Sequence, residues 1–233
     1  MRTRIKLCGL QTFETVQACV QAGADAVGFV MYPPSVRHVS VEQAARLACH
    51  LGAWQTPVVL FVNPEVDLVR QVIQAIPQVL LQFHGDETAE FCQQFNRPYL
   101  KAIRMKADTD LQQASTEFAS AQALLVDSWS EAYGGSGHTF DWSLLPKPGE
   151  LKQALVLSGG LDEANVGEAI RAVWPYGVDV SSGIESARGV KDIQKIARFC
   201  AAVQAADMSA QHGAETPSQT SALDQCVNDS TEQ

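Results

Sequence analysis

Short apolar runs alternate along the chain with longer segments in which apolar residues recur every three or four positions. The short runs are typical of buried β-strands and the longer segments of amphipathic helices. The runs predict strands near residues 5–8, 26–30, 58–62, 79–84, 100–104, 124–127, 155–157 and 178–181. The helical segments lie near residues 13–21, 41–51, 65–75, 88–95, 110–118, 141–145, 165–173 and 190–205.

This alternation of strands and helices predicts a parallel sheet, because each helix carries the chain back to the start of the next strand. Closing the sheet into an α/β (β/α)8 TIM barrel removes both of its edges, so we expect this fold. A doubly wound open sheet is the competing fold. No Gly-x-Gly-x-x-Gly motif follows the first strand, which disfavours that alternative. We assign residues 1–206 to a single barrel domain that carries the catalytic site.

The segment from residue 207 to residue 233 has a different composition. It is rich in Ser, Thr, Gln and Ala and shows no apolar period. A segment of this kind cannot bury enough apolar surface to order itself. We therefore expect a disordered polar tail and assign it no function.

Composition and charge narrow the range of partners. The formal net charge of −9 over 233 residues disfavours nucleic acid and anionic membranes, although a few local donors can still bind a phosphorylated small molecule. The first residues lack the apolar core of a signal peptide, and no apolar run has the length of a membrane helix. The six cysteines include no Cys-x-x-Cys pair, so the sequence indicates neither a zinc site nor a disulfide framework. We expect a cytoplasmic protein, either a monomer or a homodimer.

The carboxyl ends of the strands carry the candidate catalytic residues, as in other TIM barrels. A period of two directs Lys6 and Cys8 into the barrel and places Cys8 at its mouth. A thiol there can act as a base if a nearby cation lowers its pKa; the alternative is a small buried apolar residue. Asp127 ends the sixth strand, where it can act as an acid or base; the alternative is that it caps a helix or orders a loop.

Two glycine-containing loops follow the seventh and eighth strands, at the position where TIM barrels recurrently bind phosphate. Gly159 and Gly160 belong to the first loop. Ser182 and Gly183 belong to the second, directly after the predicted strand that carries Asp179. Glycines let the backbone approach an anion, and free N–H groups can then hold it. The two loops together indicate a site for a phosphate ester.

Four further features remain open at this stage. Arg37 lies in a Pro-rich loop and can either bind a carboxylate or phosphate or remain solvated. His84 ends the fourth strand, where we expect a structural hydrogen bond. Lys101 can in principle form a Schiff base, as can Lys6, but a lysine at the edge of the core is the simpler interpretation. The glycine-rich loop at residues 133–138 can be a lid or a flexible connection.

Taken together, these segments resemble the phosphoribosylanthranilate isomerase family over about residues 3–205. The matching segments are KLCG (6–9), GADAVGF (23–29), SVR (35–37), VLFVN (59–63), LQFHG (81–85), LVD (125–127), GSG (135–137) with FDW (140–142), SGGL (158–161) and DVSSGIE (179–185). Phe83 stands where the family more often has Leu. The polar tail lies outside the pattern.

The resemblance implies a function and a set of roles. The expected reaction is the Amadori rearrangement of N-(5-phosphoribosyl)anthranilate to 1-(o-carboxyphenylamino)-1-deoxyribulose 5-phosphate, a step of tryptophan biosynthesis. Cys8 matches the family's general base, Asp127 its general acid and Arg37 the residue that holds the anthranilate. The glycine loops match its phosphate cradle, and Asp179 is grouped with these substrate-binding residues. The resemblance implies no cofactor and no metal.

Three other functions compete with this one. The first is a phosphosugar barrel enzyme of another kind, such as a Schiff-base aldolase that uses Lys6 or Lys101. The second is a dual-substrate isomerase of histidine and tryptophan synthesis, which the presence of Cys8 instead of an aspartate disfavours. The third is a barrel that binds a phosphorylated metabolite without catalysis, which the joint presence of Cys8, Asp127 and both loops disfavours.

Overall fold

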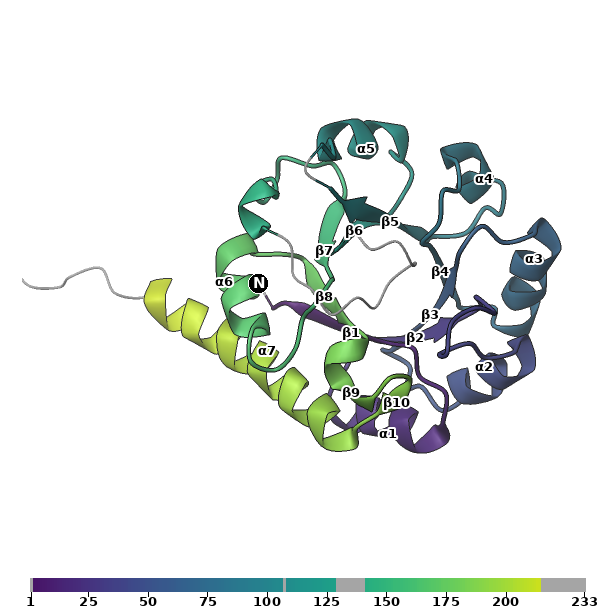
Figure 1. The fold of residues 1–233 in the computed structure, drawn as a ribbon, viewed down its shortest axis with the longest axis horizontal. Coiled ribbons are helices and arrows are strands. Elements are labelled where there is room, and N and C mark those ends of the chain that lie inside the picture. Colours follow the sequence, from purple (N-terminus) through teal and green to yellow (C-terminus); the bar gives the residue numbers. More distant parts are fainter. Residues whose placement is uncertain (1, 107, 129–140, 215–233) are drawn as a thin grey trace, which may run out of the picture.

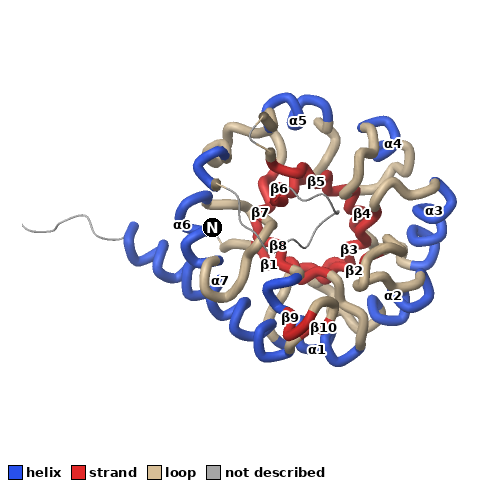
Figure 2. The backbone as a smooth tube through the Cα atoms, viewed as in Figure 1, coloured by secondary structure: helices blue, strands red, loops and turns tan. Residues whose placement is uncertain are grey.

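The computed structural model describes residues 2–106, 108–128 and 141–214, and within them the chain forms a closed barrel of eight parallel strands (Figure 2). The strands follow one another around the barrel in chain order, and the last pairs with the first through the register Lys6↔Asp179. This confirms the predicted (β/α)8 barrel. The strands are β1 Arg4–Cys8, β2 Ala26–Val30, β3 Thr56–Phe61, β4 Leu80–Phe83, β5 Tyr99–Met105, β6 Ala123–Ser128, β7 Ala154–Leu157 and β8 Gly177–Val180.

The helices form an outer ring around the strands (Figure 1). They are α1 Phe13–Gln21, α2 Val41–Ala48, α3 Val66–Ala75, α4 Ala89–Gln93, α5 Leu111–Glu117, α6 Val166–Val173 and α7 Ile193–Ala214. Several begin at side chains that accept a hydrogen bond from the first turn, for example Thr12, Ser40 and Asp110. None of the described helices is long and apolar enough to cross a membrane.

The structure differs from the sequence expectation at several places. Residues 141–145 form only the short 3-10 helix η1, Trp142–Leu144, because Pro146 disfavours a helical conformation at the preceding Leu145, which is extended. The expected start of the last helix instead forms strand β10, Val190–Lys191, which pairs with β9, Glu185–Ala187. A second 3-10 helix, η2 Ser182–Ile184, precedes β9.

The C-terminal boundary also differs from the expectation. Helix α7 continues through residues 207–214, where we expected the tail to begin. Asp207 explains part of this, since its carboxylate accepts hydrogen bonds from the backbone N–H and the hydroxyl of Thr3 at 2.8 and 2.7 Å. The rest of the expected tail, residues 215–233, lies outside the described residues.

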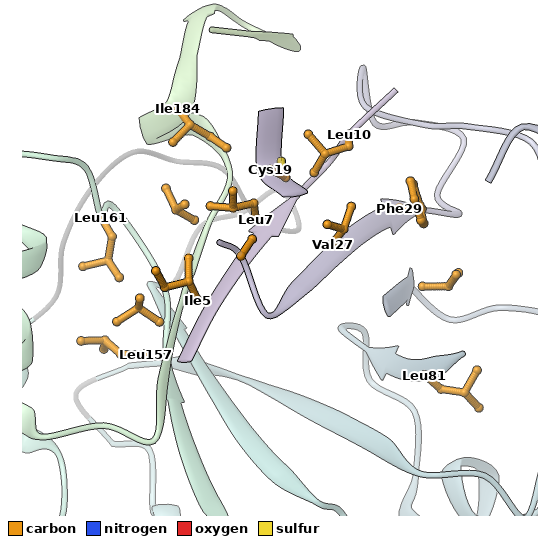
Figure 3. Close-up of a cluster of buried hydrophobic side chains, with 14 of the residues drawn as sticks. Ile5, Leu7, Leu10, Cys19, Val27, Phe29, Leu81, Leu157, Leu161 and Ile184 are labelled. Atoms are coloured by element: carbon orange, nitrogen blue, oxygen red, sulfur yellow. The ribbon is translucent and has the colours of Figure 1, made fainter. Parts of the chain in front are cut away.

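Two apolar layers hold the barrel together. The larger layer lies between the strands and the helices and includes Ile5, Leu7 and Val27, which Figure 3 shows on the outer side of β1 and β2. The smaller layer fills the barrel interior and includes Val58, Leu100, Ala102, Ala123, Leu125 and Val156. On β6 the outer residues Leu124 and Val126 alternate with Leu125, which belongs to the interior. This alternation directs the next odd-numbered residue, Asp127, inward at the mouth.

Candidate active site

A cavity opens at the carboxyl ends of the barrel strands, and it brings most of the predicted site residues together. Its lining includes both proposed catalytic residues and most of the proposed binding residues. They are Cys8, Arg37, Asp127, Gly159, Gly160, Asp179 and Ser182. Gly183 lines an adjoining hollow together with Gly160 and Ser182. The cavity therefore collects groups from β1, β6 and the loops after β2, β7 and β8.

Cys8 lies at the end of β1 with only 4% of its surface exposed. Gly28 on β2 makes room for it, because a Cβ atom at residue 28 would lie 2.7 Å from the Cys8 Sγ atom. Burial raises the pKa of the Cys8 thiol above its ordinary value, and the positive charges of Lys6 and Lys191 oppose that rise without cancelling it. The cation that the sequence analysis required is present, but the thiol form is favoured in this structure.

Lys6 and Asp179 form a buried ion pair below the thiol, with 2.8 Å between Nζ and Oδ1. Burial alone would lower the pKa of Lys6, yet the Asp179 carboxylate and the Cys8 side chain raise it overall. Lys6 is therefore held as a cation beside Cys8. Asp179, which we grouped with the substrate-binding residues, lines the cavity but directs its Oδ1 atom at Lys6.

Asp127 belongs to a buried chain of hydrogen bonds that the sequence analysis did not anticipate. Its Oδ2 atom lies 3.1 Å from His84 Nε2, and its Oδ1 atom accepts a hydrogen bond from the Ser128 N–H. On the other side of the ring, Gln82 Nε2 lies 3.1 Å from His84 Nδ1. If the Gln82 amide donates there, the neutral imidazole carries its proton on Nε2 and donates it to Asp127.

The signal for this contact was present in the sequence but incomplete. A period of two on β4 places Gln82 and His84 on the same face, and His84 ends the run. The expectation of a hydrogen-bonding role for His84 is met. Its partner could not be deduced, because Asp127 is 43 residues away along the chain.

The loops after β7 and β8 form a backbone cradle. Gly159 has φ +87°, and a Cβ atom there would lie 2.4 Å from the Ser128 nitrogen. A Cβ atom on Gly183 would lie 2.0 Å from the Leu161 carbonyl oxygen, so the two loops are in direct contact. Within the described part of the chain, no acceptor takes a hydrogen bond from the N–H groups of Gly159, Gly160, Ser182 and Gly183. Unsatisfied N–H groups of this kind favour an anion.

Arg37 reaches the cavity from the loop after β2. Its guanidinium forms a bidentate ion pair with Glu185, at 2.6 Å from Nε to Oε1 and 2.8 Å from Nη2 to Oε2. Glu185 starts β9, directly after η2 in the loop that follows β8. The sequence analysis included Glu185 only within a family motif and gave it no role.

Lys101 lies outside the cavity. It follows Leu100, which faces the barrel interior, so its own side chain points toward the helices. There its ammonium donates to Glu87 at 2.9 Å and to the Gly85 carbonyl oxygen at 2.7 Å. This position excludes Lys101 from chemistry at the barrel mouth. Among the described residues, no group of three or more His, Cys, Asp or Glu side chains is placed to hold a metal ion. The loop at residues 133–138 lies outside the described residues.

Comparisons with known proteins agree with this geometry. The family model described as N-(5′-phosphoribosyl)anthranilate (PRA) isomerase matches residues 5–202. The N-(5′-phosphoribosyl)anthranilate isomerase of Dechloromonas aromatica (strain RCB) is 52% identical over 209 residues, which cover 90% of this chain and 100% of that protein.

Two solved structures have closely similar folds. A phosphoribosyl anthranilate isomerase in complex with reduced 1-(o-carboxyphenylamino)-1-deoxyribulose 5-phosphate superposes with a TM-score of 0.77 at 35% identity, covering 87% of this chain and 99% of the other. A structure of monomers generated from the dimeric isomerase of Thermotoga maritima gives a TM-score of 0.76 at 34% identity, covering 87% of this chain and 98% of the other.

Proposed function

Since the chain belongs to the N-(5′-phosphoribosyl)anthranilate isomerase family, we propose that Cys8 is the general base and Asp127 the general acid of its reaction. The chain is an aldose–ketose isomerase of tryptophan biosynthesis. It converts N-(5-phosphoribosyl)anthranilate to 1-(o-carboxyphenylamino)-1-deoxyribulose 5-phosphate. The observation that supports the residue roles is that a thiol, a carboxyl group and a backbone anion cradle line one cavity.

The substrate phosphate would bind the cradle. Gly159, Gly160, Ser182 and Gly183 offer N–H groups that no described residue uses, and the short helix η2 begins at Ser182. Backbone donors fix a phosphate without adding charge to the site. With the phosphate anchored at the loops after β7 and β8, the ribose would extend across the mouth between β1 and β6.

Ring opening would begin at Asp127. Its carboxyl group donates a proton to the furanose ring oxygen, the C1′–O4′ bond breaks, and the substrate nitrogen takes up the positive charge as an iminium ion. His84 holds the same carboxyl group through its Nε2 atom at 3.1 Å, which fixes the orientation of the acid. The substrate's own nitrogen is the electron sink, so the step needs no cofactor.

Proton removal would follow at Cys8. The iminium charge acidifies the C2′ hydrogen, and the thiolate takes that proton to leave an enaminol. The ammonium groups of Lys6 and Lys191 favour the thiolate that this step needs. The enaminol then gains a proton at C1′ and releases one from O2′, which yields the ketone and allows both catalytic groups to return to their starting states.

The test is the fluorescence decay of freshly made phosphoribosylanthranilate after addition of purified protein. We expect Cys8→Ala and Asp127→Asn each to lose about 10²–10⁴-fold in turnover, the usual effect of removing a positioned acid or base. Cys49→Ala and Asp67→Asn serve as matched controls, since both side chains are exposed and lie away from the cavity. If a folded Cys8 or Asp127 variant keeps near-normal turnover, its assigned role is wrong.

The compartment and the assembly state are also proposals. A reducing cytoplasm fits the five free cysteines among the described residues, four of which are buried. The phosphorylated substrate is the expected partner, and a monomer or a homodimer remains the expectation for the chain itself. Analytical ultracentrifugation distinguishes the two states. The dimeric relative from Thermotoga maritima makes the homodimer a concrete alternative.

A further inference from the structure

Arg37 is fixed in place by its surroundings before any substrate binds. Its side chain is 11% exposed, and its stem crosses the backbone of Gly9, where a Cβ atom would lie 2.7 Å from the Arg37 Cδ atom. Gly9 has φ +80°, so a side chain at that position would be both strained and in the way. The glycine after Cys8 therefore lets the stem of Arg37 pass close to the backbone that follows the proposed base.

Glu185 determines the orientation of that guanidinium. The carboxylate is 4% exposed and accepts four hydrogen bonds: two from Arg37, one from Lys191 Nζ at 2.8 Å and one from the Gly189 N–H at 3.0 Å. Burial opposes the charge of Glu185, but the Arg37 and Lys191 contacts outweigh it and lower the pKa of this carboxyl to about 2. The Glu185 side chain is thus a fixed anion at neutral pH.

The bidentate pair uses only one edge of the guanidinium. Nε and one N–H of Nη2 face Glu185, which leaves both N–H groups of Nη1 and the second N–H of Nη2. No described residue accepts a hydrogen bond from Nη1. The remaining edge can form a second fork, and Arg37 lines the cavity. A fork of two parallel N–H groups matches a carboxylate.

The local charge favours the same ligand. Arg37 and Lys191 carry two positive charges against the single negative charge of Glu185. Lys191 is 3% exposed and also donates to the carbonyl and hydroxyl oxygens of Ser181, so it is held in place. One anionic group of the substrate neutralises the single excess positive charge of this buried cluster.

We infer that Glu185 is a positioning residue for carboxylate recognition: its bidentate pair with Arg37 directs the free edge of the guanidinium at the aromatic carboxylate of the substrate. This rests on the proposed function and on the role that the family resemblance implies for Arg37, which is to hold the anthranilate part of the substrate. Arg37 alone is therefore insufficient to recognise the carboxylate. The buried carboxylate behind it determines whether the cavity discriminates between substrates with and without the ortho carboxylate.

The experiment compares two substrates on the same variants. One is N-(5-phosphoribosyl)anthranilate, and the other is N-(5-phosphoribosyl)aniline, which lacks the carboxylate and is made by the same condensation. We expect Glu185→Gln to raise KM for the anthranilate compound about ten- to a hundredfold, with a much smaller change in kcat. KM for the aniline compound should stay within about twofold of wild type. Asp67→Asn, an exposed carboxylate paired with Arg70 on α3, is the control and should change neither value.

Two results overturn the inference. An equal rise in KM with both substrates would mean that Glu185 stabilises the whole site and has no specific role in carboxylate recognition. An unchanged KM for the anthranilate compound in Glu185→Gln would mean that Arg37 binds the carboxylate without being oriented by Glu185. Thermal unfolding followed by circular dichroism establishes that each variant is folded. If Glu185→Gln does not fold, Glu185→Asp and Arg37→Lys take its place, because each keeps the charge and breaks the bidentate geometry. These variants should also lose the discrimination between the anthranilate and aniline compounds.

Arg37→Ala separates this inference from the proposed function. If Arg37→Ala abolishes the discrimination and Glu185→Gln retains it, only the role of Glu185 is wrong. If Arg37→Ala itself retains the wild-type discrimination, the anthranilate-binding role of Arg37 is wrong, and the inference about Glu185 fails with it.

Discussion

Gly183→Ala tests the phosphate cradle more directly than any substitution of a charged residue would. The residue lies in the middle of η2, between the loop after β8 and the loop after β7. A Cβ atom there would meet the Leu161 carbonyl oxygen at 2.0 Å and the Asp162 Cα atom at 3.0 Å. Both atoms belong to the backbone, so no side-chain rotation can relieve the clash.

The size of the effect follows from these distances. Ordinary van der Waals contact begins near 3.4 Å, so the two loops must separate by about 1.4 Å to admit the methyl group. Misplacing a substrate by about 1 Å costs on the order of 10²-fold in rate. We therefore expect kcat/KM to fall at least about a hundredfold. Overpacking should also destabilise the fold by about 1–3 kcal/mol.

The assay is the fluorescence decay of phosphoribosylanthranilate, with inorganic phosphate as a competitive inhibitor. If the cradle binds the substrate phosphate, inhibition by phosphate should weaken in parallel with kcat/KM. Gly52→Ala is the control, because a Cβ atom at residue 52 would meet only the Gln55 side chain, at 3.4 Å. A folded Gly183→Ala protein with kcat/KM within about threefold of wild type would refute the assignment of this cradle.

Three further predictions concern charge. The pKa of Cys8 lies above its ordinary value of 9.0, so the kcat/KM of the wild type should rise with pH across the range of about 6 to 9. Cys8→Asp replaces the thiol by a carboxyl group and should shift this rise toward a pKa of about 4. A flat wild-type profile would contradict the base assignment. Glu185 has a lowered pKa of about 2 in the folded protein, against about 4.5 in the unfolded chain. Its ionised carboxylate therefore stabilises the fold above pH 4.5, and this stabilisation is lost as the pH falls toward 2. Urea unfolding should show that the free energy of unfolding falls by about 3 kcal/mol over this range in the wild type but not in Glu185→Gln. Glu87→Gln removes the carboxylate charge that pairs with the buried Lys101 ammonium and should cost about 3–5 kcal/mol in urea unfolding. A loss below about 1 kcal/mol would mean that the remaining hydrogen bonds, such as that to the Gly85 carbonyl oxygen, suffice to hold the ammonium.

The sequence determined most of the strands and helices, because their patterns are local. The period of two on β1 placed Cys8 on the inward face, and Asp127 was expected at the barrel mouth because it ends an apolar strand. Both residues line the cavity there. Closure of the barrel was also predictable, since eight βα units leave two edges that closure removes. The glycine-containing loops after β7 and β8 indicated a phosphate site, because TIM barrels recurrently bind phosphate at these loops and glycines let the backbone approach an anion.

Local patterns failed where a tertiary contact overrides them. Residues 190–191 continue the helical pattern of α7, yet they pair with β9, where Lys191 donates to Glu185. Residues 207–210 have the composition of a tail, yet Thr3 ties Asp207 to the start of β1 and the helix continues. In each case a contact outside the segment, six residues away for Lys191 and 204 for Asp207, stabilises a backbone conformation that the local sequence does not specify.

Only the tertiary structure decided which polar and charged side chains pair. His84 with Asp127, Lys6 with Asp179 and Arg37 with Glu185 are separated by 43, 173 and 148 residues along the chain. Ion pairs and hydrogen bonds depend on distances of a few ångströms between side-chain atoms, and those distances exist only after the barrel has closed. Sequence periodicity places a residue on a face, whereas closure of the barrel brings two such faces together.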